Sequence, residues 1–419
     1  MASANHSKTK VKLARQINLP LLVLYGLSVT VGAGIYVLIG ESAARAGQHA
    51  PLAFLIAGVL VALSAASYAE LSGRFPVSAG EAAYVDAATT NQWLPFAVGL
   101  LVCAAGLFSS ATVLRGGAGY VQEFVAAPAW LIAVVTGLAI GAIAAWGIRQ
   151  SVWTTAILAV VEIGFLFAIA IMGTMTAPVL PTFFEAFTPS DLSIAFGLSS
   201  AVLLAFFAFI GFEDMVNVAE EVQNPGRNLP LAIALTLIIT TLLYITVVTV
   251  ALSVALPSEL AESRAPLALV YQRLFGAHSS IVSAIAIAAI INGVLVQTVM
   301  VSRVLYGMSR LGRLPSILGI ISPKTQTPLH ATAITIAVTL ILTLIPQTAI
   351  LADLTSTFTL LVFASINYAL WHIKRNDTQT HADVITVPIW CPVAGLVVSV
   401  LFLFFEWSSR LEFFYLGWS

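Results

Sequence analysis

The feature that most constrains this chain is a pair of glycines in the middle of its first apolar segment. Residues 17–39 form an uncharged apolar run, and Gly32 and Gly34 lie near its centre among β-branched residues. A run of this length is sufficient to cross a bilayer as a helix. Two glycines one residue apart weaken a helix interior and permit close approach of other backbone. The sequence therefore predicts a membrane-spanning helix that is broken at residues 30–36.

A second apolar run is interrupted in the same way. Gly211, with Glu213 and Asp214 close behind it, lies inside the run that begins near Leu192. Unpaired backbone at membrane depth is tolerated only where it is buried in protein or lines a cavity. The alternative is that such glycines only let neighbouring helices pack closely, as we expect for Gly99. Two interrupted segments at corresponding positions of two halves favour a binding site formed by both breaks.

The composition indicates a polytopic membrane protein in a lipid bilayer. Hydrophobic residues make up 59% and charged residues 9% of the chain, whereas about a quarter of a soluble domain is charged. Nothing in the charge pattern favours a nucleic-acid partner. The six histidines show no metal-binding spacing, and the two cysteines do not form a disulfide framework. We expect no metal, no cofactor and no enzymatic activity, and the sequence predicts no oligomeric state.

Apolar windows predict an all-α protein with about eleven membrane spans. The expected spans are residues 17–40, 51–73, 93–125, 130–148, 152–175, 193–218, 229–255, 280–309, 329–345, 349–372 and 388–407. With the N-terminus inside, twelve Lys and Arg residues lie on the cytoplasmic side and only Arg45, Arg264, Arg273 and Arg410 lie outside. The positive-inside rule therefore predicts a multi-pass protein of the cell membrane with a cytoplasmic N-terminus and an external C-terminus.

The number of spans also predicts the internal architecture. If span one runs outward, span six runs inward, so the two broken helices begin two five-helix repeats of inverted topology. The repeats would cover residues 17–176 and 193–372 of a single transmembrane domain, 1–419, and an additional helix would cover 388–407. Residues 266–275 predict a short amphipathic helix outside the membrane.

The two breaks suit a zwitterionic ligand. The half-helix that follows a break presents N–H groups that attract anions, and the half-helix before it presents carbonyls that attract cations. We expect amides of residues 33–35 to hold a carboxylate, and carbonyls near Val29, Thr30, Phe207 and Ile210 to hold an ammonium group. The predicted ligand-binding residues are Val29, Thr30, Gly32, Ala33, Gly34, Ile35, Phe207, Ala208, Ile210, Gly211 and Asn292.

At this point the chain resembles a known family, the amino acid, polyamine and organocation (APC) transporters. The resemblance rests on Gly32 to Tyr36, Tyr68 to Leu71, Gly80 to Tyr84, Phe206 to Pro225 and Ser302 to Met308, in that order. It implies a LeuT-like fold with discontinuous helices 1 and 6, and secondary active transport of an amino acid substrate by alternating access.

The sequence is compatible with several substrate classes and several modes of transport. Because Glu213 is the only acidic residue expected to face the pocket, we expect neutral L-amino acids as substrates, and we expect their transport to occur by proton symport. The alternatives are an amino acid exchanger and a cationic amino acid or polyamine permease. A channel lacks a recognisable selectivity filter here, and a sensor with a transporter fold is a further alternative.

Ionisable residues inside the spans are candidates for coupling and gating, because charge is costly there. Glu162 is the only charged residue between Trp153 and Thr174, in the region of span five where the resemblance places a coupling lysine. We expect Glu162, and next Glu213, to carry a proton as coupling ion, while the alternative is a structural glutamate. Glu70 and Arg303 are predicted to form cytoplasmic gate ion pairs, unless they are solvated surface charges.

Overall fold

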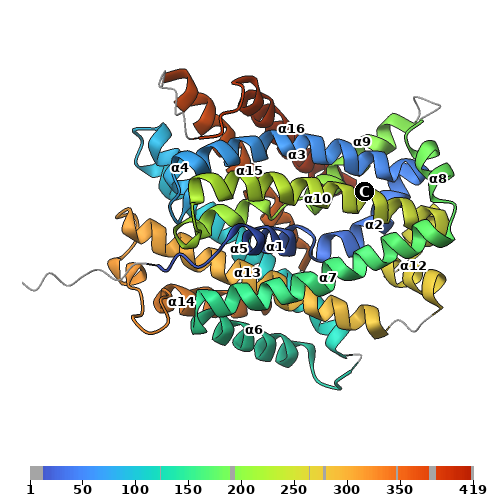
Figure 1. Cartoon of the computed structure of the whole chain (residues 1–419), viewed down its shortest axis with the longest axis horizontal. Coiled ribbons are helices and arrows are strands. Elements are labelled where there is room, and N and C mark those ends of the chain that lie inside the picture. Colours follow the sequence, from blue (N-terminus) through green and yellow to red (C-terminus); the bar gives the residue numbers. More distant parts are fainter. Residues whose placement is uncertain are drawn as a thin grey trace, which may run out of the picture.

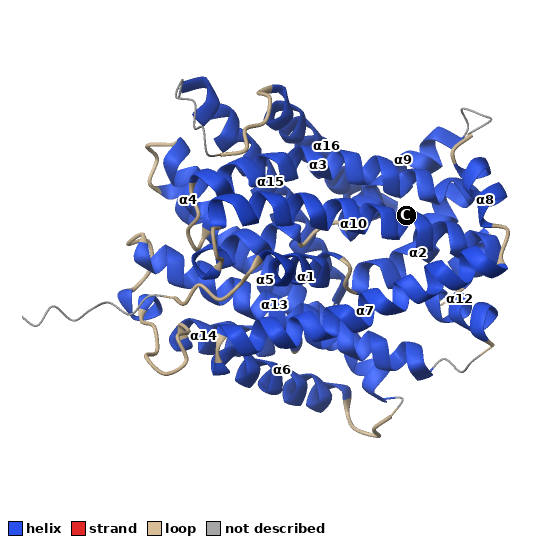
Figure 2. Cartoon of the chain, viewed as in Figure 1, coloured by secondary structure: helices blue, strands red, loops and turns tan. Residues whose placement is uncertain are grey.

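The computed structural model is a bundle of helices joined by loops (Figures 1 and 2). It describes residues 13–122, 124–188, 194–263, 265–276, 280–345, 348–376 and 384–416. In chain order the elements are α1 (Leu19–Thr30), α2 (Ala33–Ala46), η1 (Gly47–His49), α3 (Ala50–Arg74), α4 (Gly80–Ala88), α5 (Trp93–Gln122), α6 (Ala129–Trp146), α7 (Ile148–Thr176), α8 (Val179–Ala186), α9 (Ile194–Ala208), η2 (Phe212–Glu221), α10 (Pro225–Val254), α11 (Pro257–Glu262), α12 (Pro266–Phe275), α13 (Ser280–Arg310), η3 (Ser316–Gly319), α14 (Leu329–Thr343), α15 (Thr348–Asn376) and α16 (Trp390–Leu416).

The first predicted break lies between α1 and α2. Helix α1 ends at Thr30, whose hydroxyl donates back to the carbonyl of Gly26 at 2.9 Å. Val31 and Gly32 are not helical, and α2 begins directly after them. The all-α fold with a discontinuous first helix is therefore confirmed at the residues that the sequence predicted.

The second break lies between α9 and η2. Gly211 has φ +124°, which L side chains rarely adopt, and a Cβ there would lie 2.6 Å from Cγ1 of Val29. Glycine is therefore required both for the local backbone and for the close approach to the first break. The segment that follows is a 3₁₀ helix, the tighter geometry that often marks a functional site. The two breaks thus lie against each other.

Most predicted spans agree with helices to within a few residues. In the described part of the chain, nine helices are long and apolar enough to cross a membrane. Two shorter apolar helices, α1 and α14, have 12 and 15 residues. At 1.5 Å per residue α1 is about 18 Å long, so it spans a bilayer only together with α2. The expectation of eleven spans remains a prediction, because length and composition alone do not fix the count.

Equivalent helices of the two predicted repeats make equivalent contacts. Helix α3 packs on α10, and α5 packs on α13. The contact of α1 with α10 has its counterpart in α9 with α3, and that of α5 with α15 has its counterpart in α13 with α7. Such exchange of partners is compatible with two repeats, and their inverted topology remains a prediction. Helix α7, which corresponds to the predicted span 152–175, packs against α1.

The bundle has two ends. Figure 1 places α4 at one end, here the α4 side, and α8 and α12 at the other, the α8 side. The sequence predicts that the α4 side is cytoplasmic; four of the charges behind that prediction, Lys8, Lys10, Lys12 and Arg264, lie outside the described residues.

The predicted amphipathic helix at residues 266–275 is confirmed as α12. It is tied to α11 by an ion pair in which Arg273 Nη2 lies 2.6 Å from Glu259 Oε1. Hydrogen bonds from Arg273 and from the amide of Leu256 lower the pKa of Glu259 to about 2. This half-buried carboxylate therefore stays charged well into the acidic range.

Candidate functional site

A cavity of about 450 Å³ lies where the two helix breaks meet α5, α13 and α15. Glu81 of α4 lines it toward the α4 side. On α15 the lining runs from Ala352 to Phe363. Because Lys374 near the end of α15 binds Glu70 at the α4-side end of α3, Ala352 lies toward the α8 side, and it is exposed. The cavity therefore extends from the α4 side toward the α8 side.

The cavity collects about half of the predicted ligand-binding residues. Those that line it are Val29, Gly32, Phe207, Ile210 and Gly211, together with the predicted proton carrier Glu213. Thr30, Ile35, Ala208 and Asn292 are buried but do not line it. Ala33 and Gly34 form the start of α2.

Tyr244 of α10 joins the two breaks, a role that the sequence did not reveal. Its hydroxyl oxygen lies 2.6 Å from the carbonyl oxygen of Thr30 and 2.9 Å from that of Ala208. These are the last residues of α1 and α9, whose carbonyls have no partner within their own helices. Tyr244 therefore occupies the carbonyl of Thr30, one of those predicted to hold an ammonium group, and the carbonyl of Ala208, next to Phe207. No pattern around position 244 signals such a long-range contact.

The carboxyl groups of η2 already have hydrogen-bond donors. The amide of Gly211 donates to Glu213 Oε2 at 2.8 Å, and Gln297 Nε2 of α13 donates to Asp214 Oδ2 at 2.7 Å. Both residues line the cavity and are nearly completely buried. Of the two, the sequence predicted only Glu213 to face a ligand.

Glu81 is the acidic residue of the site that sequence reasoning missed. It lies in the first turn of α4, is 1% exposed and lines the cavity, and neither of its carboxyl oxygens has a well-formed hydrogen bond. Helix α4 lies between the spans α3 and α5. Burial raises the pKa of Glu81 to about 8, although its own backbone amide and the side-chain amide of Asn217 lower it, and the nearby charge of Glu213 adds to the rise. In the sequence, Glu81 stands out only because it lies in the stretch Gly80 to Tyr84, which resembles the family. That resemblance did not assign Glu81 a role in the site.

Glu162 and Asn292 form a direct pair away from the cavity. Asn292 Nδ2 of α13 donates to Glu162 Oε1 of α7 at 2.9 Å, and both side chains are fully buried. The second oxygen of Glu162, the amide oxygen of Asn292 and the hydroxyl of Tyr36 have no partner. Asn292 therefore contacts the predicted proton carrier rather than the cavity.

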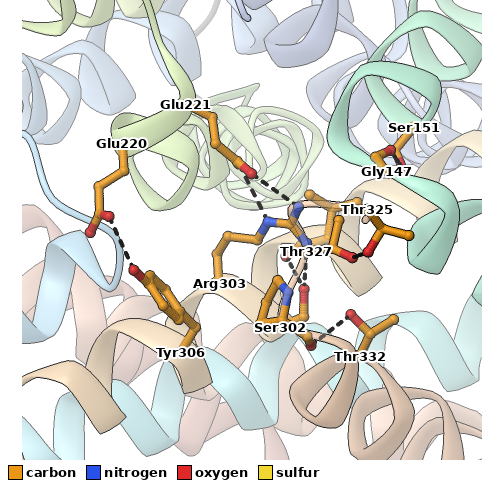
Figure 3. Close-up of polar contacts among 12 residues, drawn as sticks. Gly147, Ser151, Glu220, Glu221, Ser302, Arg303, Tyr306, Thr325, Thr327 and Thr332 are labelled. Carbon is orange, nitrogen blue, oxygen red and sulfur yellow. Dashed lines mark hydrogen bonds and ion pairs between the residues drawn. The ribbon is translucent and has the colours of Figure 1, made fainter. Parts of the chain in front are cut away.

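Arg303 forms a buried ion pair with Glu221 on the α4 side. Arg303 Nη2 lies 3.1 Å from Glu221 Oε1, both side chains are fully buried, and Arg303 Nη1 also donates to the hydroxyl of Ser302 (Figure 3). Figure 3 also shows Tyr306 pointing toward Glu220. The alternative of a solvated Arg303 is therefore wrong, because the guanidinium links η2 to α13.

Glu70 belongs to a different ion cluster. It binds Arg74 at 2.6 Å and Lys374 at 2.8 Å, and it also accepts from the amide of Val387. Its side chain is fully buried, so the alternative of a solvated charge is wrong here too. The cluster fastens α15 and the segment before α16 to the end of α3. Glu70 and Arg303 are therefore two separate anchors and not one pair.

The chain that precedes α1 is also fastened to η2. The amide of Ile17 donates to the carbonyl of Glu221 at 3.0 Å, and the amide of Gln223 donates to the carbonyl of Ile17 at 2.8 Å. Together with the Arg303–Glu221 pair, these bonds hold the base of α1, η2 and α13 together. The α4 side of the bundle is therefore closed below the cavity.

Comparison with known proteins gives concordant results. The amino acid permease family matches residues 19–410. Cationic amino acid transporter 2, vacuolar, of Arabidopsis thaliana is 31% identical over 87% of this chain and 60% of its own length. Cationic amino acid transporter 3, mitochondrial, of the same plant is 28% identical over 63% of its length. This chain thus spans less than two thirds of those two relatives.

Two further comparisons cover nearly the whole of both chains. The branched-chain amino acid permease BcaP of Bacillus subtilis is 29% identical over 96% of this chain and 90% of its own length. A crystal structure of MhsT in complex with L-phenylalanine superposes with a TM-score of 0.64 at 14% identity, covering 95% of this chain and 99% of the other. This structural likeness confirms the LeuT-like fold.

Proposed function

Because the chain belongs to the amino acid permease family, we propose that it is a secondary active transporter that moves amino acids across the cell membrane by alternating access. One observation carries the proposal: a single cavity is lined by backbone-broken segments of two helices, at Gly32 and at Gly211. Irregular backbone at membrane depth is tolerated where it lines such a cavity.

In this proposal, the helix ends at the breaks bind the common part of the amino acid. The first amides of α2, at residues 33–35, would donate to the α-carboxylate, because they have no partners within the helix and lie at its positive end. Backbone at Val29, Phe207 and Ile210 would face the ammonium group. Tyr244 would hold the two breaks in a fixed position relative to each other, since its hydroxyl contacts the carbonyls of Thr30 and Ala208.

The closed α4 side and the cavity's extension toward the α8 side support an outward-facing state. For release on the α4 side, the ion pair of Arg303 with Glu221 and the backbone bonds of Ile17 would have to separate. These contacts would therefore form the cytoplasmic gate, with the N-terminus in the cytoplasm and the C-terminus outside, as the charge distribution predicts.

Proton coupling through Glu162 is our proposal for the driving force. The carboxyl is fully buried and shares one hydrogen bond with Asn292. Helix α7, which carries it, packs against α1 and α13. A change of protonation there would alter how these helices meet, and thereby link proton and substrate occupancy. Exchange of one amino acid for another is the alternative cycle.

The names of the relatives do not select one substrate, since they include cationic and branched-chain amino acids. The prediction of neutral substrates rested on Glu213 as the only acidic residue facing the pocket, and Glu81 and Asp214 also line the cavity.

The experiment that tests the proposal is uptake of labelled amino acids into liposomes that contain the purified protein. Saturable, amino-acid-specific uptake supports a transporter. Non-saturable flux would indicate a channel, and binding without flux would indicate a sensor. Preloading with unlabelled substrate separates exchange, which requires it, from symport, which a proton gradient accelerates.

A further inference from the structure

The α4-side end of the cavity, here called the acidic floor, consists of Glu81, Glu213 and Asp214. These residues are 1%, 8% and 4% exposed, and all three line the cavity. Among the described lining residues there is no Lys, Arg or His. Three carboxyl groups thus share a buried space whose walls supply no positive charge, an arrangement that is costly unless protons or a bound cation neutralise it.

The three carboxyl groups differ in the hydrogen bonds that the protein donates to them. Glu213 accepts a hydrogen bond from Gly211, and Asp214 accepts one from Gln297. Neither oxygen of Glu81 has a well-formed hydrogen bond, although its own backbone amide and the side-chain amide of Asn217 favour its charged form. Oε1 of Gln297, which lines the same cavity, has no donor. Buried acceptors without donors are rare in native proteins and call for an explanation. Here the free acceptors border an empty space large enough for a donor from a ligand.

None of the titratable groups around Glu81 carries a positive charge that could pair with its carboxylate. They are Glu213 and Asp214 of η2, Tyr68 of α3, Tyr84 of α4 and Cys103 of α5. Each of these groups is either neutral or negative. A ligand that carries its own positive charge would therefore match both the electrostatics and the free acceptors of the floor.

We propose that Glu81, assisted by Asp214 and Gln297, receives the positively charged end of the substrate's side chain, so that the transported amino acids are basic. The proposal rests on the proposed function, since the helix breaks would hold the α-carboxylate and α-ammonium groups of the same molecule. Gly32 and Glu81 line one continuous cavity of about 450 Å³, which lies within the range of small-molecule sites. A basic side chain would extend from the breaks to the floor.

The test compares two ligands that differ only at the end of the side chain. Binding of L-lysine and of L-norleucine, which lacks the terminal ammonium group, is measured on the purified full-length protein in detergent. A charge-assisted hydrogen bond in a buried site predicts that L-lysine binds roughly 10- to 100-fold more tightly. In Glu81→Gln, which keeps the shape and removes the charge, the preference should fall about tenfold or more, with little change for L-norleucine.

A matched control is available on the same helix. Asp86 of α4 is paired with Arg313 and does not line the cavity, so Asp86→Asn should leave the lysine preference unchanged. Melting curves of each variant show whether it is folded.

An unchanged preference in folded Glu81→Gln, or a wild-type protein that prefers L-norleucine, overturns the role of the acidic floor but leaves amino acid transport intact. If no amino acid binds or is transported, the proposed function itself fails.

Discussion

Asn292 donates a hydrogen bond of 2.9 Å to Glu162, joining α13 to α7 inside the bundle. The sequence predicted a substrate contact for Asn292 and a proton for Glu162. In this pair, the amide of Asn292 donates to the carboxyl group that we propose binds and releases a proton. The other oxygen of Glu162 has no partner. A protonated Glu162 could donate from that oxygen, whereas a charged one could not. The pair is therefore suited to respond to a single proton.

Glu162→Gln mimics the protonated state permanently. We expect it to preserve amino acid binding and exchange but to lose the acceleration of uptake by an inward proton gradient. Liposome uptake with and without the gradient measures this difference. Glu41→Gln, at an exposed position of α2, is the control and should behave like the wild-type protein. Gradient-driven uptake by Glu162→Gln at the wild-type rate would show that the proton is carried elsewhere or that none is coupled.

Tyr244→Phe removes only the hydroxyl that bridges the two breaks. Because the carbonyls of Thr30 and Ala208 lose this donor, we expect a loss of about 1–2 kcal/mol in stability and weaker substrate binding. Tyr68→Phe is the matched control, since the Tyr68 hydroxyl is buried without a partner and its removal should cost less. Melting temperatures and ligand titrations compare the two. Equal effects of both substitutions would contradict the bridging role.

Gly211→Ala adds a single methyl group where the backbone has φ +124° and Val29 is 2.6 Å from the new Cβ. We expect binding to fall at least tenfold, because the break must shift away from the cavity lining. Gly164→Ala in α7, where a Cβ would meet nothing within 4 Å, should leave binding unchanged. Substrate affinity of the folded variants is the measurement, and normal affinity in Gly211→Ala would remove this break from the site.

Arg303→Met leaves Glu221 buried without its partner. Breaking a buried pair in this way costs about 3–5 kcal/mol, whereas replacing both members with apolar residues often recovers the loss. We therefore expect Arg303→Met and Glu221→Leu each to lower the melting temperature, and the double variant to recover most of it. Strictly additive losses would mean that the two residues do not act as a pair.

The broken helices, most span limits and the short helix at 266–275 could all be predicted from the sequence. These features depend on local patterns: apolar run length, glycine inside a run, and amphipathic spacing. The length of α1 is an instructive case. Its 12 helical residues are too few for a bilayer, yet the run of residues 17–39 predicts a complete span because the break does not interrupt the hydrophobicity.

The partners of the site residues could not be predicted, because they come from helices far away in sequence. Tyr244 reaches Thr30 across 214 positions, and Asn292 reaches Glu162 across 130. Glu81 lies in a short helix outside the spans, where a carboxylate usually faces water. Only packing against η2 shows that it is buried and faces the cavity.

The last prediction concerns the pH dependence of lysine binding at Glu81, whose pKa burial raises to about 8. If only the charged form of Glu81 receives the ammonium group, about 1% of the protein is competent at pH 6 and about half at pH 8, so lysine affinity should rise roughly 50-fold over this range. L-norleucine, measured in parallel, corrects for other titrating groups.

The raised pKa of Glu81 also determines whether the stability of the folded protein rises or falls with pH. An ordinary glutamate near pKa 4.5 ionises in the unfolded chain while folded Glu81 keeps its proton, so Glu81 reduces stability progressively from about pH 4.5 to pH 8. Glu81→Gln should therefore melt at a higher temperature than the wild-type protein at pH 8, with the difference shrinking toward pH 5. A melting difference that is flat across this range, or a lysine affinity that falls as pH rises relative to L-norleucine, would contradict a titrating Glu81 on the cavity floor.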